Sequence, residues 1–221
     1  MARRITLPKL VLAASLVAGA SYVASWDLAI SPAAAMAWKG AGVGLLAVYA
    51  ALRARDLDGW LITAVMALGA LGDVLLEAFG LTVGAVAFLA GHLVAIWLYL
   101  RNRRPSLSLS QRLLAILLVP ATVFVAYLLP ADRAGAPGVA VYATVLALMA
   151  AAAWTSRFHR YRVGAGALMF VASDLLIFAR SGALTHAPWI DLAVWGLYYL
   201  GQILLCIGVT GALAKPRDAP L

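Results

Sequence analysis

Long apolar segments separated by short polar turns make up most of the chain. A helix needs about 20 residues to cross the ~30 Å of hydrocarbon in a bilayer. Apolar segments of that length lie near residues 7–26, 33–52, 59–79, 82–100, 111–129, 137–155, 163–181 and 189–213. They are continuous and rich in Ala and Leu, whereas strands of a membrane β-barrel would alternate apolar and polar residues. The pattern predicts an all-α, polytopic membrane protein with about eight transmembrane helices in a single transmembrane domain, residues 1–221.

Composition and charge add a membrane orientation to this prediction. Hydrophobic residues make up 65% of the 221 residues, too many for a soluble domain. The net charge of +8 comes from Lys and Arg in the turns on one side of the membrane, and only Lys39, Arg133 and Arg180 fall on the other side. Loops rich in Lys and Arg stay in the cytoplasm, so both termini are predicted to be cytoplasmic, in a membrane of the bacterial inner (plasma) membrane type. The basic clusters are interpreted as topology determinants and lipid contacts, and no nucleic-acid partner is expected.

The first apolar segment has a second interpretation. Basic residues before it and small residues near Ala24-Ser25 are also the pattern of a cleaved signal peptide. The segment is long enough to span the membrane and completes the count of eight, which favours a retained helix. The single Cys206 excludes an internal disulfide and a CxxC metal site, and it is predicted to be a packing residue.

Two carboxylic acids lie deep inside apolar segments. Asp73 stands in Gly72-Asp73-Val74-Leu75-Leu76-Glu77, with Glu77 one turn later, and Asp174 stands in Ser173-Asp174-Leu175-Leu176-Ile177. A charged side chain near the bilayer centre costs at least ~2.5 kcal/mol, so such an acid normally faces a polar cavity and has a function. Two acids at matching places predict one shared site.

The segments that follow the two acids also correspond. Gly84, Phe88 and His92 are spaced by four and therefore share one helical face. Their segment aligns with Tyr198-Tyr199-Leu200-Gly201-Gln202, which predicts two parallel four-helix repeats, with halves 1–104 and 105–221. The fifth and sixth segments hold no buried charge and are predicted to be structural, with a possible kink at Pro120.

The polar residues of these segments fall at similar depth. At ~1.5 Å per residue, both aspartates lie in the outer half of the membrane. Residues returning from the outer side reach the same layer, namely His92, Tyr198 and Gln202. With no buried Arg or Lys expected beside them, at least one of the acids should hold a proton at neutral pH. A protonated acid beside an ionised one provides general acid and general base catalysis, although each acid could instead form a private structural hydrogen bond.

The sequence lacks other common catalytic motifs. There is no GxSxG or HExxH motif, and His159 and His186 fall on opposite sides of the membrane, so a three-His zinc site is excluded. One histidine with the two aspartates could still hold a metal. We expect no metal and no cofactor.

Taken together, the order of these motifs resembles the lysoplasmalogenase family, also called the YhhN family, over most of the chain. The resemblance is carried by Gly72-Asp73-Val74-Leu75-Leu76, by Gly84, Phe88 and His92, by Ser173-Asp174, and by Tyr198-Tyr199-Leu200-Gly201-Gln202. It implies hydrolysis of the vinyl ether bond of a lysoplasmalogen, which gives a fatty aldehyde and glycerophosphoethanolamine or glycerophosphocholine. A lysophospholipid is therefore the expected substrate.

The resemblance implies the following roles. One of Asp73 and Asp174 would protonate the vinyl ether while the other stabilises the cation and deprotonates water, and which does which stays open. Glu77 would meet the amine of an ethanolamine headgroup. The supporting residues that orient the acids or bind substrate oxygens would be His92, Ser173, Tyr198, Tyr199 and Gln202.

Two other classes of function remain open at the level of sequence. Parallel repeats with buried acids also suit a proton-coupled transporter of lipids or small molecules, and the chain could be a membrane scaffold without catalysis. Within the hydrolase interpretation, another vinyl ether or lysolipid could be the natural substrate.

Overall fold

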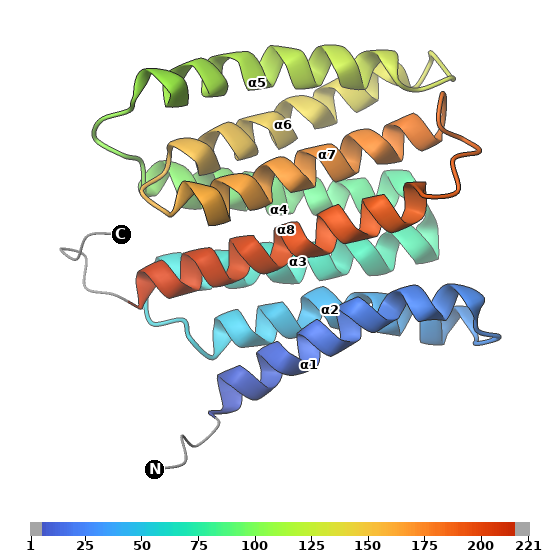
Figure 1. Ribbon diagram of the computed structural model, residues 1–221, viewed down its shortest axis with the longest axis horizontal. Helices are drawn as coiled ribbons and strands as arrows, with labels where there is room; N and C mark the ends of the chain where they lie inside the picture. Colours follow the sequence, from blue (N-terminus) through green and yellow to red (C-terminus); the bar gives the residue numbers. More distant parts are fainter. Residues whose placement is uncertain (1–5, 215–221) are drawn as a thin grey trace.

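A computed structural model describes residues 6–214 of the chain. In this part of the chain, eight helical segments are long and apolar enough to cross a membrane (Figure 1). They are α1 (Leu7–Ser21) continued by the 3-10 helix η1 (Tyr22–Asp27), α2 (Pro32–Ala51), α3 (Leu57–Phe79), α4 (Leu81–Arg101), α5 (Leu109–Leu128), α6 (Ala136–Thr155), η2 (Arg160–Gly164) continued by α7 (Ala165–Arg180), and α8 (Ile190–Leu213). Each predicted segment matches one of them to within three residues, so the all-α, eight-span prediction is confirmed.

Local signals set the ends of several helices. The Ser31 hydroxyl accepts a hydrogen bond from the Ala34 N–H (3.2 Å) ahead of Pro32, and the Asp56 carboxylate accepts one from the Gly59 N–H (2.9 Å) at the start of α3. Such caps satisfy backbone donors that a helix leaves free at its N-terminus. Gly80 separates α3 from α4 with φ of 86°, a left-handed conformation that glycine adopts without strain.

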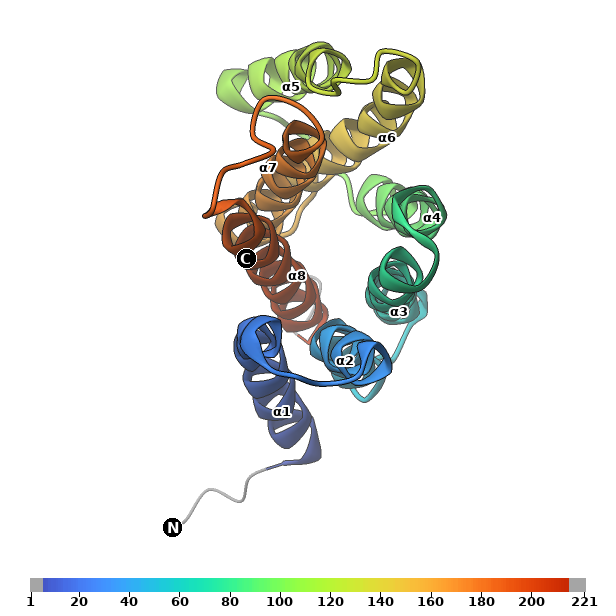
Figure 2. The same ribbon diagram turned by 90° about the vertical axis from the view of Figure 1, so that its right-hand side faces the viewer.

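The helices lie side by side, and α1 begins and α8 ends at the same end of the bundle, here called the terminal end (Figure 1). The view along the bundle shows α2, α3, α4, α6, α7 and α8 arranged around its centre, with α1 and α5 on the periphery at opposite sides (Figure 2). Helices α3 and α7 are the third helices of the two predicted halves, and they lie on opposite sides of this centre (Figure 2). The aspartate of each of these two helices is therefore placed for a shared site.

Helix α1 is hydrogen-bonded into the bundle. The Ser15 hydroxyl donates to the Gly42 carbonyl of α2 (2.6 Å), and the Tyr199 hydroxyl of α8 donates to the Ser15 carbonyl (2.6 Å). Cys206 is buried with its thiol 3.6 Å from the Leu46 carbonyl, in agreement with its predicted packing role. The two hydrogen bonds of Ser15 give the first helix a structural role in this bundle.

Helices α7 and α8 touch through two glycines. A Cβ at Gly201 would lie 2.8 Å from the Gly166 carbonyl oxygen, and a Cβ at Gly166 would lie 2.8 Å from the Gly201 carbonyl oxygen. Backbone atoms of packed helices cannot move aside as a side-chain end can. The pair therefore fixes the distance between the helix that carries Asp174 and the helix that carries Tyr198.

We expect Gly201→Ala to destabilise the protein by about 1–3 kcal/mol, because the added methyl group overpacks this contact. Gly211→Ala is the matched control in the same helix, since no atom lies within 4 Å of its added Cβ. Thermal unfolding in detergent should show a lower midpoint for Gly201→Ala than for Gly211→Ala. Equal midpoints would mean that α7 and α8 do not approach as closely as described.

Candidate active site

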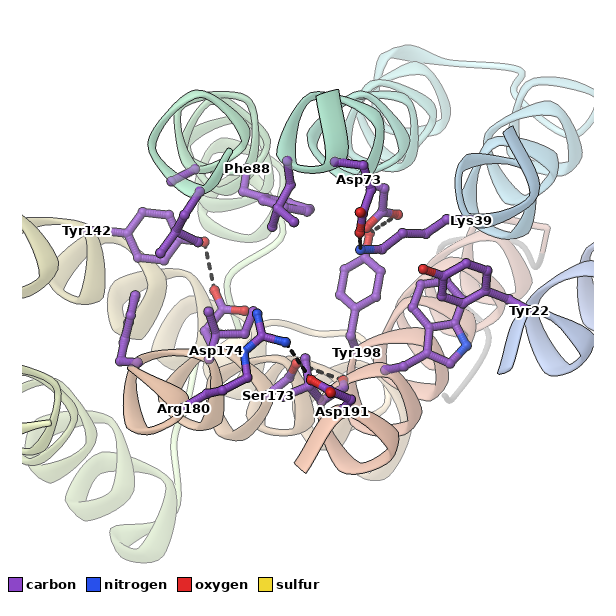
Figure 3. A pocket seen from close by; sticks show the side chains of 18 of the residues that line it. Tyr22, Lys39, Asp73, Phe88, Tyr142, Ser173, Asp174, Arg180, Asp191 and Tyr198 are labelled. Carbon is purple, nitrogen blue, oxygen red and sulfur yellow. Dashed lines mark hydrogen bonds and ion pairs between the residues drawn. The ribbon is translucent and has the colours of Figure 1, made fainter. Parts of the chain in front are cut away.

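A cavity of about 260 Å³ lies between the helices at the end of the bundle opposite the terminal end. Asp73 of α3 and Asp174 of α7 both line it, together with Ser173 and Tyr198. Trp26 also contributes to its wall and is 43% exposed, which marks the mouth of the cavity. Figure 3 shows the two aspartates on opposite walls. The shared position that the sequence predicts for the two acids is thus found in the structure.

Asp73 is held by a tyrosine of α8. Its side chain is 2% exposed, and its Oδ2 accepts a hydrogen bond from the Tyr198 hydroxyl (2.8 Å). The same hydroxyl lies 3.4 Å from the Gly69 carbonyl oxygen, one turn before Asp73. Gly69 has no side chain to keep α8 away, since a Cβ there would lie 2.8 Å from the Nε2 atom of Gln202, one turn further along α8 than Tyr198. The Tyr198 hydroxyl of α8 therefore fixes the orientation of the Asp73 carboxyl group on α3.

Asp174 is held by a second tyrosine, from α6. Its side chain is 5% exposed, and its Oδ2 accepts a hydrogen bond from the Tyr142 hydroxyl (2.7 Å). The Nε2 atom of His92 lies 3.2 Å from the same hydroxyl. Because the single phenolic hydrogen is directed to Asp174, the phenol oxygen accepts from His92, which requires a hydrogen on Nε2. His92, Tyr142 and Asp174 form one hydrogen-bonded chain across three helices.

The hydrogen bonds that join His92, Tyr142 and Asp174 correct two expectations from the sequence. The sixth apolar segment is not purely structural, because it supplies Tyr142 to the cavity. His92 does not line the cavity and reaches Asp174 only through Tyr142. A phenol inside an Ala-rich apolar segment, at the depth of the acids, was the one signal in the sequence that pointed to Tyr142.

A lysine corrects the expectation that no cation lies beside the acids. Lys39, two turns into α2, is only 14% exposed in its side chain, and its Nζ forms a 2.5 Å salt bridge with Glu77. Lys39 extends toward Asp73 in Figure 3, and its charge acts on that carboxyl group. Asp73 is therefore next to a cation, whereas Asp174 is held by neutral groups among the described residues that hydrogen-bond to it.

The remaining predicted residues lie in three different environments. Ser173 lines the cavity, and its hydroxyl donates to the Val194 carbonyl of α8 (2.9 Å). Tyr199 points away from the cavity to Ser15 of α1, as described above. Gln202 is 1% exposed beneath Gly69 and does not line the cavity. Glu77 lines it but is already paired with Lys39.

Aromatic rings pack together beneath the acids. Phe88 and Phe170 lie 6.1 Å apart between ring centroids, and both contact the Tyr198 ring, at 5.8 and 5.2 Å. Phe170 also contacts His92 at 5.0 Å. The edge-to-face geometry of these contacts is favourable for aromatic rings. This cluster separates the cavity from the deeper part of the bundle.

A second ion pair lies among the residues of the cavity wall. Arg180 at the end of α7 forms a 2.5 Å salt bridge with Asp191 at the start of α8. The side chains of both residues are more than 40% exposed. The cavity thus has two partly exposed ion pairs, Arg180–Asp191 and Lys39–Glu77, and two buried carboxyl groups.

Comparison with known proteins places most of the chain in one family. The sequence profile of the YhhN family matches residues 34–209. These residues include α3, α4, α6 and α7 and the part of α8 that supplies Tyr198. No curated protein and no solved structure matches the chain.

Proposed function

The chain belongs to the YhhN family, and on that premise we propose that it hydrolyses the vinyl ether bond of a lysoplasmalogen. One observation carries the proposal: two buried aspartates from separate helices line the same cavity, and each is oriented by its own tyrosine. Paired carboxyl groups in different surroundings are the usual equipment of general acid and general base catalysis.

The chemistry of a vinyl ether needs such a pair. A carboxylic acid donates a proton to the β-carbon of the double bond, and the resulting oxocarbenium ion needs a nearby negative charge. A carboxylate then removes a proton from water as the water oxygen attacks the cation. The hemiacetal collapses to a fatty aldehyde and the free glycerol hydroxyl of the glycerophospho-base. Substrate and one water together give the two products.

The surroundings of the two acids assign their roles. Asp73 lies beside the Lys39 ammonium, so we assign to it the carboxylate that stabilises the cation and accepts the proton from water. Asp174 is held by the neutral Tyr142, so we assign the proton donor to it. Tyr142 occupies Oδ2, which leaves Oδ1 to carry the transferred proton. When the hemiacetal collapses, the hemiacetal hydroxyl gives its proton to Asp174. At the same time, Asp73 passes its proton to the leaving ether oxygen.

The cavity suits the polar end of a lysolipid. Its volume of about 260 Å³ is below the ~300–1,000 Å³ of pockets that enclose a whole drug-sized ligand. We therefore place the glycerol and the vinyl ether inside, with the rest of the alkenyl chain outside. The ion pairs Lys39–Glu77 and Arg180–Asp191 offer cations to a phosphate and carboxylates to an ammonium group. An ethanolamine headgroup would compete with Lys39 for Glu77.

The test is release of aldehyde by the purified protein in detergent. Lysoplasmenylethanolamine should be converted to aldehyde and glycerophosphoethanolamine. The matched 1-O-alkyl lysolipid should remain intact, because a saturated ether has no double bond to protonate. A proton-coupled transporter would move lysolipid across liposomes without changing it, and a scaffold would do neither. Absence of aldehyde from protein that is folded and supplied with substrate would refute the proposed hydrolysis.

We expect Tyr142→Phe to lower kcat for aldehyde release about 10-fold to 100-fold. The ring would still fill the space between His92 and Phe178, but Asp174 would lose the donor that orients it. KM should change little, since the phenol acts on the acid and not on the headgroup. Tyr127→Phe, on the exposed face of α5, is the control and should behave as wild type. Equal rates for the two variants would show that Tyr142 does not orient the acid.

A further inference from the structure

A second cavity, of about 270 Å³, lies at the terminal end of the bundle, far from the two aspartates. It is formed where α2 and α8 end and where α1 and α3 begin. Its wall includes Leu52, Arg53, Arg55, Asp56, Gly59 and Thr210. The proposed hydrolysis uses none of these residues.

Arg53 brings an unused hydrogen-bond donor to this cavity. Its guanidinium packs on the Tyr49 ring at 5.4 Å, and one terminal nitrogen lies 3.5 Å from the Thr210 carbonyl oxygen. Its Nε is buried and has no hydrogen-bond partner among residues 6–214. Burying a polar group of this kind without a partner costs free energy, so the position favours an acceptor in the cavity.

The charges around the cavity define that acceptor. Arg53 and Arg55 supply two positive charges, and neither belongs to an ion pair among the described residues. The one carboxylate in the wall, Asp56, has its Oδ1 engaged with the Gly59 N–H at the start of α3. The wall therefore carries a net positive charge. Guanidinium groups bind phosphate oxygens with strong, directed hydrogen bonds.

Exposed apolar side chains lie on the cavity wall, at Leu52, or within two residues along the chain of residues that line it. Leu52 and Leu57 are 44% and 46% exposed, and Leu7, Leu10 and Trp60 are each more than 50% exposed. On a membrane-spanning helix such residues face lipid, and tryptophan is enriched where lipid meets water. The phosphate of a lipid could accept hydrogen bonds from the arginines while its acyl chains pack on this apolar surface.

We propose that this cavity binds the phosphate group of an anionic membrane phospholipid, held by Arg53 and Arg55, with its acyl chains along the exposed leucines. Basic pockets between transmembrane helices are typical sites for anionic lipid headgroups. By the charge of the loops, this end faces the cytoplasm. The site therefore takes its lipid from the inner leaflet, whereas the catalytic cavity opens at the other end.

Native mass spectrometry of the delipidated, full-length protein in detergent tests the proposal. With phosphatidylglycerol as the probe, wild type should form a one-to-one complex. Arg53→Gln and Arg55→Gln should each weaken it about 10-fold to 100-fold, the range for losing a charge-assisted hydrogen bond. Arg112→Gln is the control, because Arg112 is an exposed arginine at the same end, on α5, and does not line the cavity. Arg55 is exposed, so its variant should fold even if Arg53→Gln does not.

Three results would overturn the proposal. The first is equal binding of phosphatidylglycerol by Arg55→Gln and Arg112→Gln. The second is equal binding of phosphatidylcholine and phosphatidylglycerol by wild type, since a zwitterionic headgroup offers no net charge. The third is displacement of the lipid by glycerol phosphate at equal concentration, which would mean that the site binds a soluble phosphate. The outcome is independent of aldehyde release, so failure of one proposal leaves the other intact.

Discussion

Asp174→Asn is expected to lower kcat for aldehyde release by about 10³-fold, within the range that general acid catalysis contributes. Asparagine has nearly the same shape and can still accept the Tyr142 hydrogen bond, so the helices around it should pack as before. It has no acidic proton to give to the β-carbon, and carbon is a poor proton acceptor from water at neutral pH. Protonation would become the slow step, and the rate should fall without a comparable change in KM.

The measurement is the rate of aldehyde release from lysoplasmenylethanolamine under saturating substrate. Asp132→Asn is the control, because Asp132 is exposed in the loop between α5 and α6, where its carboxylate accepts from the Ala134 N–H. It should turn over as wild type does. Unaltered thermal midpoints in both variants would exclude loss of fold. A rate for Asp174→Asn within a few-fold of wild type would remove Asp174 from the proton transfer.

The membrane helices could be predicted from the sequence because the bilayer sets their length. Each needs an apolar stretch long enough for the hydrocarbon layer, and few other structures satisfy the backbone there. The two acids could be predicted for a related reason. Placing Asp73 or Asp174 in an apolar transmembrane helix costs free energy unless the side chain faces a polar cavity. Both kinds of signal act within a single helix and can therefore be read from the sequence alone.

The partners of the acids could not be predicted in the same way, because they come from other helices. Tyr142 is a common residue type in an apolar helix, and only the packing of α6 against α7 places its hydroxyl 2.7 Å from Asp174. Lys39 stands in the first half of its segment, from which a long cationic side chain can normally reach water. The structure shows it turned to Glu77 instead. Contacts between helices depend on their rotation, which the sequence of one helix does not fix.

Helical geometry could have corrected one expectation beforehand. Neighbouring residues on an α-helix point about 100° apart, since a turn has 3.6 residues. Tyr198 and Tyr199 therefore could not both face the acids. The structure directs Tyr198 to Asp73 and Tyr199 to Ser15 of α1. One tyrosine of the shared motif serves the candidate site, and the other attaches the first helix to the bundle.

Asp73→Asn is the second substitution with a large expected effect, and it tests the assignment of roles. We expect kcat to fall about 10²-fold to 10³-fold, because the oxocarbenium ion loses its counter-charge and water loses its base. Asparagine still accepts from Tyr198, and Lys39 stays paired with Glu77, so the cavity should keep its shape. Aldehyde release is measured across a range of pH, with the uncatalysed acid hydrolysis of the vinyl ether subtracted from each point.

The pH dependence separates the two carboxyl groups. The charged and titratable groups around Asp73 are Lys39 from α2, Glu77 from α3, Tyr198 from α8 and, across the cavity, Asp174. In the proposed mechanism, wild type needs Asp73 ionised and Asp174 protonated, so its rate should fall at both low and high pH and peak between them. Asp73→Asn should lose only the fall at low pH, and Asp174→Asn only the fall at high pH.

The opposite pattern would exchange the two roles and leave the hydrolysis itself in place. The double variant completes the argument. If both acids act along one reaction path, removing the second should cost little more than removing the first, because effects within a catalytic unit are not additive. A double variant slower by the product of the two single effects would mean that Asp73 and Asp174 act in independent steps.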